Sequence, residues 1–171
     1  RTVRHGDRSV VLRSYTEAFG ARSYMLRAAR RGTSSVIPQP LDRLELVVTE
    51  DARHEMHTVR EWRVERPYQR VRSEHARGLL LLFAQEVLHR TLREEVADHQ
   101  LFDQVQFVLE EIDSSDDLAH LPLLLLLRLS DPLGFQPERP LEEMGHFDMR
   151  EGRFLAGRPM HGFCMDGETS K

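Results

Sequence analysis

The 171-residue chain contains one cysteine, Cys164, and one lysine, and only 7% of its residues are aromatic. A single thiol cannot form an internal disulfide or a zinc site built from several cysteines, and it favours a reducing, cytoplasmic environment. The longest apolar run, residues 121–127, contains a proline and is far shorter than the roughly 20 apolar residues of a membrane helix. The first residues show no signal-peptide pattern, and without an initiator methionine we expect residue 1 not to be the native start.

The sequence also lacks the short motifs of catalysis. It contains no P-loop, no GxGxxG and no nucleophile elbow. The paired carboxylates at 110–111 and 116–117 fall at predicted helix ends, where acidic residues are ordinary. The histidines are dispersed, and His161 with Cys164 would supply only two metal ligands. We therefore expect no catalytic residue, no metal and no cofactor, although an enzyme acting on a nucleic acid or a phosphorylated substrate remains an alternative.

Charge is divided unevenly along the chain. Residues 1–77 carry sixteen arginines and ten acidic residues, a net charge of +6. Residues 78–171 carry eight basic and eighteen acidic residues, a net charge of −10, which together account for the total of −4. The basic half predicts an anionic partner, and the planar guanidinium of arginine suits phosphate. A GC-rich genome would explain the preference for arginine over lysine equally well, but not the division of charge.

The first 64 residues predict short strands separated by turn signals. The strands are expected at 1–4, 8–15, 22–29, 43–49 and 55–64, with a loop at 30–40. One face of the last strand is expected to carry Met56, Thr58, Arg60, Trp62 and Val64. Five strands in about 65 residues suit a small closed barrel, because closure removes exposed sheet edges.

From Ser73 onward the apolar residues recur at helical spacing. Helices are expected at 73–92, 98–112 and 116–130, and Ser73 is expected to cap the first. The leucine run of the third helix is apolar all round, which predicts a place at the centre of a helical bundle. After these helices, segments 146–149 and 153–155 are expected to form a hairpin, and 157–171 a loose end.

The order of these tracts resembles the RecO family of bacterial recombination mediators. GDRSVVLRSYTEAFG (6–20) is the strongest part, followed by IPQPLDRLELVV (37–48). LLLFAQEVLHRTLREEVADHQLFDQVQFVLEEID (80–113) and LLLLLRLSDPLGFQPE (123–138) resemble the helical domain of the family. HFDMREGRF (146–154) resembles the following segment in the Bacteroidetes branch. The resemblance covers about residues 1–155, although no single motif is diagnostic.

The resemblance implies an α+β chain with two domains. Residues 1–72 would form a five-stranded OB-fold barrel that binds DNA, and residues 73–171 an α-helical domain with a C-terminal hairpin and tail. Many members carry a four-cysteine zinc module, which one cysteine cannot form and which the Bacteroidetes branch also lacks. The loop at 30–40 is shorter than the family pattern, and the chain begins inside the expected first strand.

The resemblance also implies a function in DNA repair and homologous recombination without a catalytic centre. Such a protein binds single- and double-stranded DNA, anneals complementary strands and, with RecR, helps load RecA onto DNA coated by single-strand-binding protein, whose C-terminal tail it binds. A nucleoid-associated location in bacteria would follow. An RNA-binding OB-fold protein is a further alternative.

DNA contact is expected on the third strand and the loop after it. The residues concerned are Arg22, Tyr24, Arg27, Arg30 and Arg31. Four arginines within ten residues can neutralise phosphates, and a tyrosine can stack on a base. The alternatives are a solvated charged surface for the arginines and the barrel core for the tyrosine. A different DNA path would follow Arg60, Arg63, Arg66 and Arg70.

A second set of arginines lies in the acidic half of the chain. Arg90, Arg93 and Arg128 are the only basic residues between Gly78 and Pro137. Given the resemblance, we expect them to pair with the acidic tail of single-strand-binding protein. Alternatively, they balance neighbouring glutamates on a solvated surface.

Overall fold

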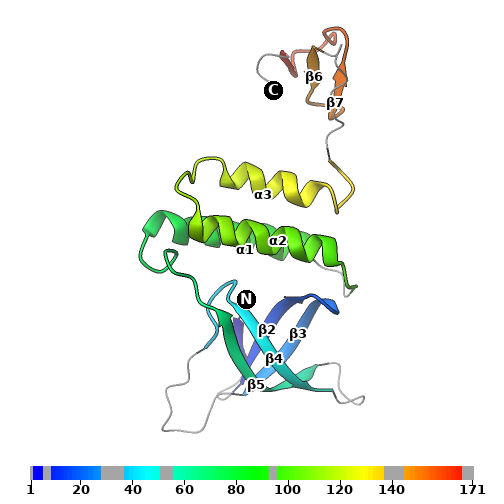
Figure 1. The fold of residues 1–171 in the computed structure, drawn as a ribbon. Coiled ribbons are helices and arrows are strands. Elements are labelled where there is room, and N and C mark those ends of the chain that lie inside the picture. Colours follow the sequence, from blue (N-terminus) through cyan, green and yellow to red (C-terminus); the bar gives the residue numbers. More distant parts are fainter. Residues whose placement is uncertain are drawn as a thin grey trace. The chain divides into compact units, whose positions relative to one another are not determined.

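A computed structural model describes residues 2–5, 9–27, 37–50, 56–92, 96–136 and 145–166 of the chain. The chain divides into two compact units, residues 1–129 and 130–171 (Figure 1). No helix in the described ranges is long and apolar enough to span a membrane.

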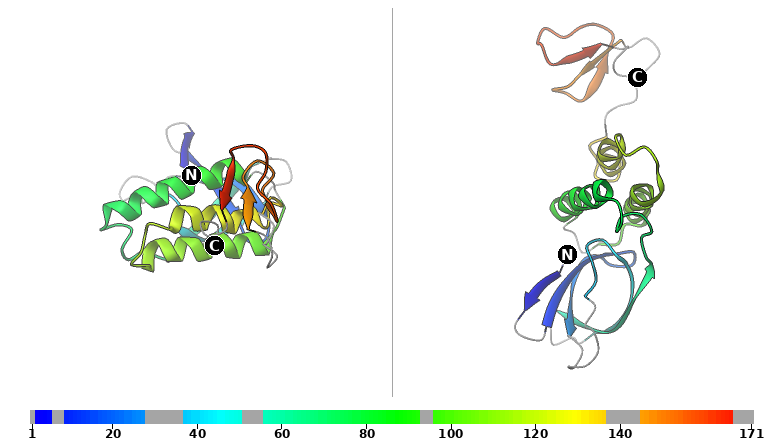
Figure 2. Two further views of the ribbon diagram at one scale, coloured as in Figure 1. Left: turned by 90° about the horizontal axis from the view of Figure 1, so that it is seen from above. Right: turned by 90° about the vertical axis from the view of Figure 1, so that its left-hand side faces the viewer.

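The N-terminal part is a five-stranded sheet. Its strands are β1 (Thr2–His5), β2 (Ser9–Thr16), β3 (Gly20–Arg27), β4 (Arg43–Thr49) and β5 (His57–Arg66). Their order is β1-β2-β3-β5-β4, with β3 and β5 parallel and the other neighbours antiparallel. The sheet is strongly curved (Figure 2), and its inner face buries Tyr24, Leu26 and Val59, with Trp62 packed against them. The predicted α+β fold with an N-terminal OB barrel is confirmed.

A bulge in β5 changes the face on which its side chains lie. Val47 of β4 pairs with Glu61, but the next residue, Val48, pairs with Val59, so that Arg60 is the extra residue. Such a bulge breaks the alternation of side chains along a strand. Val59 is therefore buried and Arg60 exposed, and the predicted single face from Met56 to Val64 is wrong.

Three helices follow the barrel in the same compact unit. They are α1 (His75–Thr91), α2 (His99–Ser114) and α3 (Leu121–Ser130). Asp98 caps α2 by accepting a hydrogen bond from the backbone N–H of Leu101 at 2.9 Å. The predicted cap of α1 is wrong, because α1 follows Glu74 and the Ser73 hydroxyl donates to the Arg70 carbonyl instead.

Helix α3 differs from its prediction in start and position. It begins at Leu121, and Pro122 lies in its first turn, where a missing N–H costs nothing. Leu121, Leu125 and Leu129 are buried, whereas Leu123 is 60% exposed and Leu126 46% exposed. The helix is thus an outer layer, on the side of α1 and α2 facing away from the barrel (Figures 1 and 2), and not the centre of a bundle.

The C-terminal unit contains a small antiparallel sheet. Its strands are β6 (His146–Asp148), β7 (Arg153–Leu155) and β8 (Cys164–Asp166), in the order β7-β6-β8. The expected hairpin is present, and the Phe147 and Phe154 rings contact each other across it at a tilt of 54°, with centroids 4.8 Å apart. The expected loose end is wrong for residues 164–166, which pair with β6; residues 167–171 lie outside the described ranges.

Candidate nucleic-acid interface

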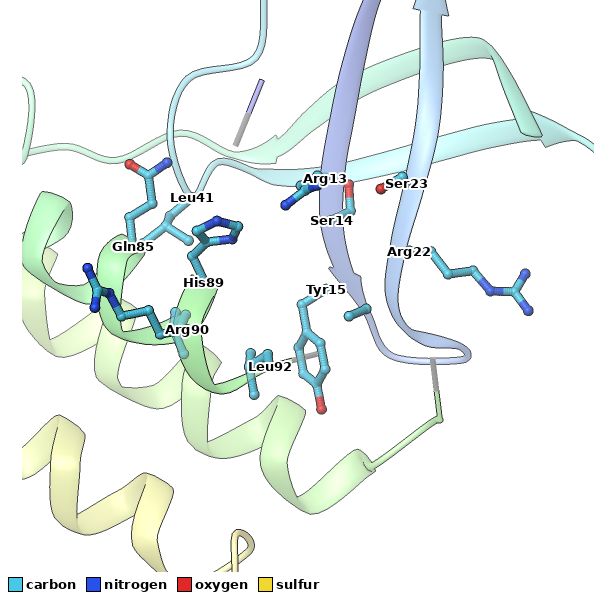
Figure 3. A pocket seen from close by; sticks show the side chains of 12 residues that line it. Arg13, Ser14, Tyr15, Arg22, Ser23, Leu41, Gln85, His89, Arg90 and Leu92 are labelled. Carbon is cyan, nitrogen blue, oxygen red and sulfur yellow. The ribbon is translucent and has the colours of Figure 1, made fainter. Parts of the chain in front are cut away.

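A cleft of about 440 Å³ separates the β2–β3 hairpin from the C-terminal turns of α1 (Figure 3). Its walls carry three arginines and a histidine: Arg13, Arg22, His89 and Arg90. Ser14, Tyr15 and Ser23 add polar groups from the strands. Arg22, predicted for DNA contact, and Arg90, predicted for partner contact, thus both border the cleft although 68 residues separate them, but the Arg22 side chain points away from α1 (Figure 3).

Arg22 lies near the start of β3, directly across from Ser14 of β2. Its guanidinium stands 4.2 Å from the centroid of the Phe19 ring and 3.7 Å from Glu50. Glu50 is largely exposed, so this ion pair is weak and screened by salt. In Figure 3 the side chain points away from α1, and it is 26% exposed. A phosphate could therefore replace Glu50 at little cost.

Arg27 lies at the opposite end of β3 and is exposed. Five residues of a strand span about 16 Å, and an odd separation places two side chains on opposite faces. Arg22 and Arg27 therefore do not form one compact patch. Arg30 and Arg31, the remaining arginines of this set, lie outside the described residues.

Tyr24 requires a correction. It is 4% exposed and packs with Leu26 and Val59 in the barrel core. Burial is also the main reason that the pKa of its hydroxyl is raised above the ordinary value. A ring enclosed on both faces cannot stack on a base, so Tyr24 does not belong to the interface. Tyr15, which lines the cleft, contacts the Phe102 ring at a centroid distance of 6.1 Å; burial, followed by Asp98, raises its pKa to about 12.

The arginines predicted for partner contact are not brought together. Arg90 donates to Glu86 one turn earlier at 2.6 Å. Arg128 of α3 donates to the Gln104 side chain at 3.2 Å and lies over the Phe107 ring, 4.8 Å from its centroid. These two arginines occupy different helices, and Arg93 lies outside the described residues.

Much of the positive charge of the first half serves the barrel–helix junction. Glu110 of α2 accepts from Arg43 of β4 at 2.7 Å and from Arg66 of β5 at 3.2 Å. Arg70, in the connection to α1, pairs with Glu74 at 2.7 Å and with Asp116 at 2.9 Å. The basic first half and the acidic second half thus neutralise each other partly within the molecule.

This pairing bears on the alternative DNA path. Three of its four arginines have acidic partners: Arg63 with Glu45 at 2.5 Å, and Arg66 and Arg70 as described above. The fourth, Arg60, donates to the hydroxyl of Thr49. A nucleic acid would have to displace these short contacts. On β3, Arg27 is exposed and the Arg22–Glu50 pair is long, at 3.7 Å, so β3 is the better candidate.

Two residues that hold the junction between the barrel and the helices were not predicted from the sequence. Arg77 is only 1% exposed, donates to Glu74 at 2.7 Å and donates to the Ile112 carbonyl at 2.8 Å. Asp113 accepts hydrogen bonds from three consecutive backbone N–H groups, at residues 69–71. The spacing of Glu74 and Arg77, one helical turn apart, was the only signal in the sequence for either residue.

Two family models match the chain. The model described as "Recombination protein O N terminal" matches residues 1–68, and the model described as "Recombination protein O C terminal" matches residues 72–139. Together they cover the barrel, the three helices and the connection into the second unit.

Similar proteins include three that are named "DNA repair protein RecO". That of Christiangramia forsetii is 28% identical over 98% of this chain and 71% of its own length. The protein of Flavobacterium johnsoniae is 26% identical over 90% of this chain and 66% of its own length. The protein of Porphyromonas gingivalis is 29% identical over 92% of this chain and 68% of its own length. The chain thus spans about two thirds of these relatives. The match of both family models, in order along a barrel and a set of helices, shows that the chain belongs to the RecO family.

Proposed function

We propose that this chain acts in DNA repair and recombination by binding DNA through its N-terminal barrel, without catalysing a reaction on it. The observation that carries the proposal is the combination of an OB barrel, matched by the N-terminal family model, with arginines at both ends of β3. OB barrels hold nucleic acid on strand faces and adjoining loops.

The DNA path that we propose runs from Arg27, at the end of β3, into the loop that carries Arg30 and Arg31. Arg22 lies at the other end of β3 on the opposite face, so it would contact a second segment of the nucleic acid. The described residues present arginines to the backbone but no base-reading motif, so binding should depend little on sequence. Salt should weaken it strongly, because phosphate contacts release counterions.

Fluorescence anisotropy with labelled oligonucleotides over a range of salt concentrations tests this path. Arg22→Ala and the double change of Arg30 and Arg31 to Ala should each weaken binding to every sequence. Each lost contact should lower the log–log salt slope by about 0.7 for single strands and 0.9 for duplexes. Arg63→Ala, at an exposed arginine paired with Glu45, is the matched control and should change neither quantity. If Arg22→Ala and the double variant both kept the wild-type affinity and salt slope, the DNA would have to bind at another surface.

The same experiment separates the alternative classes. Equal or tighter binding of RNA would favour an RNA-binding protein, and cleaved or modified oligonucleotides in the recovered samples would favour an enzyme. Unchanged oligonucleotides, bound more tightly as DNA, support the proposal.

The mediator role is the finer part of the proposal. We infer that the chain anneals complementary strands and, together with RecR, assists RecA loading onto DNA coated by single-strand-binding protein. Strand annealing can be measured by the quenching of a paired dye on complementary oligonucleotides. The chain should accelerate annealing of both free and coated strands, and no acceleration of either would contradict this role.

For the acidic tail of single-strand-binding protein, the surface at Arg128 is a better candidate than Arg90. Arg128 lies over Phe107, which is 41% exposed, so a cation and an aromatic face adjoin there. Arg90 is already paired with Glu86. Titration of a labelled tail peptide should show weaker binding to Arg128→Ala than to Arg90→Ala. Equal affinities in wild type and Arg128→Ala would exclude Arg128.

A further inference from the structure

The sheet of the C-terminal unit places three different metal-ligating side chains on one of its faces. His146 of β6 lies directly opposite Asp166 of β8, and Cys164 lies two residues before Asp166 on the same strand. Residues directly opposite each other, and residues two apart on a strand, share a face of a sheet. One nitrogen, one sulfur and one carboxylate oxygen of these side chains lie within 4.8 Å of one another.

The spacing of these atoms suits a tetrahedral ion. Zinc with bonds of about 2.0–2.3 Å holds its ligand atoms about 3.3–3.8 Å apart. Nδ1 of His146 already stands 3.3 Å from Oδ1 of Asp166. The thiol of Cys164 makes one long contact, 3.7 Å to the Met165 carbonyl, so a rotation of its side chain toward the other two atoms sacrifices little.

A second observation also points to a ligand. Nδ1 of His146 is buried and makes no hydrogen bond, although buried polar atoms are nearly always bonded. This nitrogen lies 3.3 Å from the Asp166 carboxylate without a hydrogen bond to it. In the neutral tautomer that carries its proton on Nε2, the lone pair of Nδ1 is available to a metal.

The small sheet also has little else to stabilise it. Each of its strands has three residues, and in the range 145–166 no apolar side chain is fully buried. Its other face carries Phe147, Phe154 and Met165, and none of them is buried. Small units of this kind are commonly held by a metal or a disulfide. Because the chain has one cysteine, a disulfide within it is impossible.

We propose that His146, Cys164 and Asp166 bind a divalent transition-metal ion, zinc by preference, which links β6 to β8. The mixed nitrogen, sulfur and oxygen donors fit zinc better than magnesium or calcium, which prefer oxygen alone. Three protein ligands leave the fourth position to water. The proposal differs from our expectation, drawn from the single cysteine and the dispersed histidines, that the chain binds no metal.

Cobalt is the probe that tests the site, because a thiolate bound to Co²⁺ gives a charge-transfer absorption band. The full chain, freed of metal by a chelator and kept reduced, is titrated with Co²⁺ and then with Zn²⁺. We expect the band to saturate at one ion per chain and Zn²⁺ to remove it. Since Cys164 is the only cysteine, the band can come from no other residue.

Variants assign the remaining ligands. Cys164→Ser should abolish the band, and His146→Gln and Asp166→Asn should each weaken Co²⁺ binding by at least about tenfold. His99→Gln, at a histidine 71% exposed in the other unit, is the control and should bind as wild type. Zinc should also slow alkylation of Cys164 in the unaltered chain, a readout that does not depend on the folding of any variant.

Three results would overturn the proposal. They are the absence of the charge-transfer band in the wild-type chain, an unchanged affinity in His146→Gln, and a stoichiometry of one ion per two chains. The last would show that the ion is shared between copies rather than held by one sheet.

Discussion

Arg77 is the largest side chain that is fully buried in the described part of the molecule. Its guanidinium links the start of α1 to the end of α2, since Glu74 and the Ile112 carbonyl both accept from it. An arginine is seldom buried unless every such bond is made, because an unpaired buried charge is costly. The charged side chain of Arg77 therefore anchors α1, although the pattern of apolar residues in this helix would predict that Arg77 faces solvent.

Replacing Arg77 should strongly destabilise the chain. Arg77→Ala removes both hydrogen bonds and leaves a cavity, and we expect a loss of about 3 kcal/mol in the free energy of unfolding by urea denaturation. Arg63→Ala is the control, because Arg63 is 74% exposed and its partner Glu45 is 52% exposed. Its effect should stay within about 0.5 kcal/mol. Equal midpoints for the two variants would contradict the structural role of Arg77.

Asp113 gives a pH-dependent prediction. Burial on its own would raise the pKa of this carboxyl, but hydrogen bonds from the backbone N–H groups of Gln69, Val71 and Arg70 outweigh it, and the pKa lies below its ordinary value. A lowered pKa in the folded state stabilises the fold above the unfolded pKa, near 3.9, and this stabilisation is lost as the pH falls through the folded value.

Asp113→Asn should therefore lower the unfolding free energy by about 2 kcal/mol at neutral pH. The difference from wild type should shrink as the pH falls below about 4, because the wild-type carboxyl then becomes protonated. Urea denaturation between pH 3 and 7 measures it. Asp103→Asn, at an exposed carboxylate of the same helix, should leave stability nearly unchanged at every pH. A constant difference for Asp113→Asn across the range would refute the mechanism.

At the scale of elements, α3 shows where a composition argument reaches its limit. A helix made almost entirely of leucines has no polar face to show which side contacts solvent, so its sequence predicts burial on every side. In the structure only one face of α3 is covered, because α3 packs on α1 and α2, which lie between it and the barrel (Figure 1). The described helix leaves Leu123, Leu126 and Leu127 exposed.

Two leucines of α3 should respond differently to truncation. Leu125 is 2% exposed, so Leu125→Ala should cost about 2–4 kcal/mol of unfolding free energy. Leu126 is 46% exposed, so Leu126→Ala should cost less than about 1 kcal/mol. Thermal and urea denaturation of both variants compare the two faces. A similar loss at both positions would indicate that the outer face is covered in solution.

At the scale of the whole molecule, the barrel and the helices share one compact unit. The domain boundary expected at residue 72 stays a prediction, although the junction around it is held by bonds from α2. Those bonds are the ones that Asp113 accepts from residues 69–71 and the ion pairs of Glu110 with Arg43 and Arg66. A barrel cut from the helices would lose all of them.

A fragment of residues 1–72 should consequently fold less stably than the barrel in the full chain. We expect its thermal midpoint, measured by circular dichroism, to be at least about 5 °C lower, since 1 kcal/mol shifts the midpoint of so small a domain by about 4–8 °C. The fragment should still bind DNA if β3 carries the contacts. Identical midpoints would show that the junction adds nothing to the barrel.

The sequence by itself determined the order of the elements from β1 to β7, the family and the absence of a four-cysteine zinc module, but it did not reveal β8. The order of the elements follows from local spacing and turn residues, and the absent module follows from the single cysteine. The family follows from the resemblance of the residue tracts. It also located the strand at 43–49, because that prediction depends on neighbouring residues alone.

Only the tertiary structure decided which charges are available and which faces are buried. It paired the basic half with acidic residues of α2, placed Tyr24 in the core, and brought Cys164 beside His146 across β6 and β8. Such contacts join residues 18 to 67 positions apart. They depend on how strands register and helices pack, and neither is encoded in the spacing of residues along one segment.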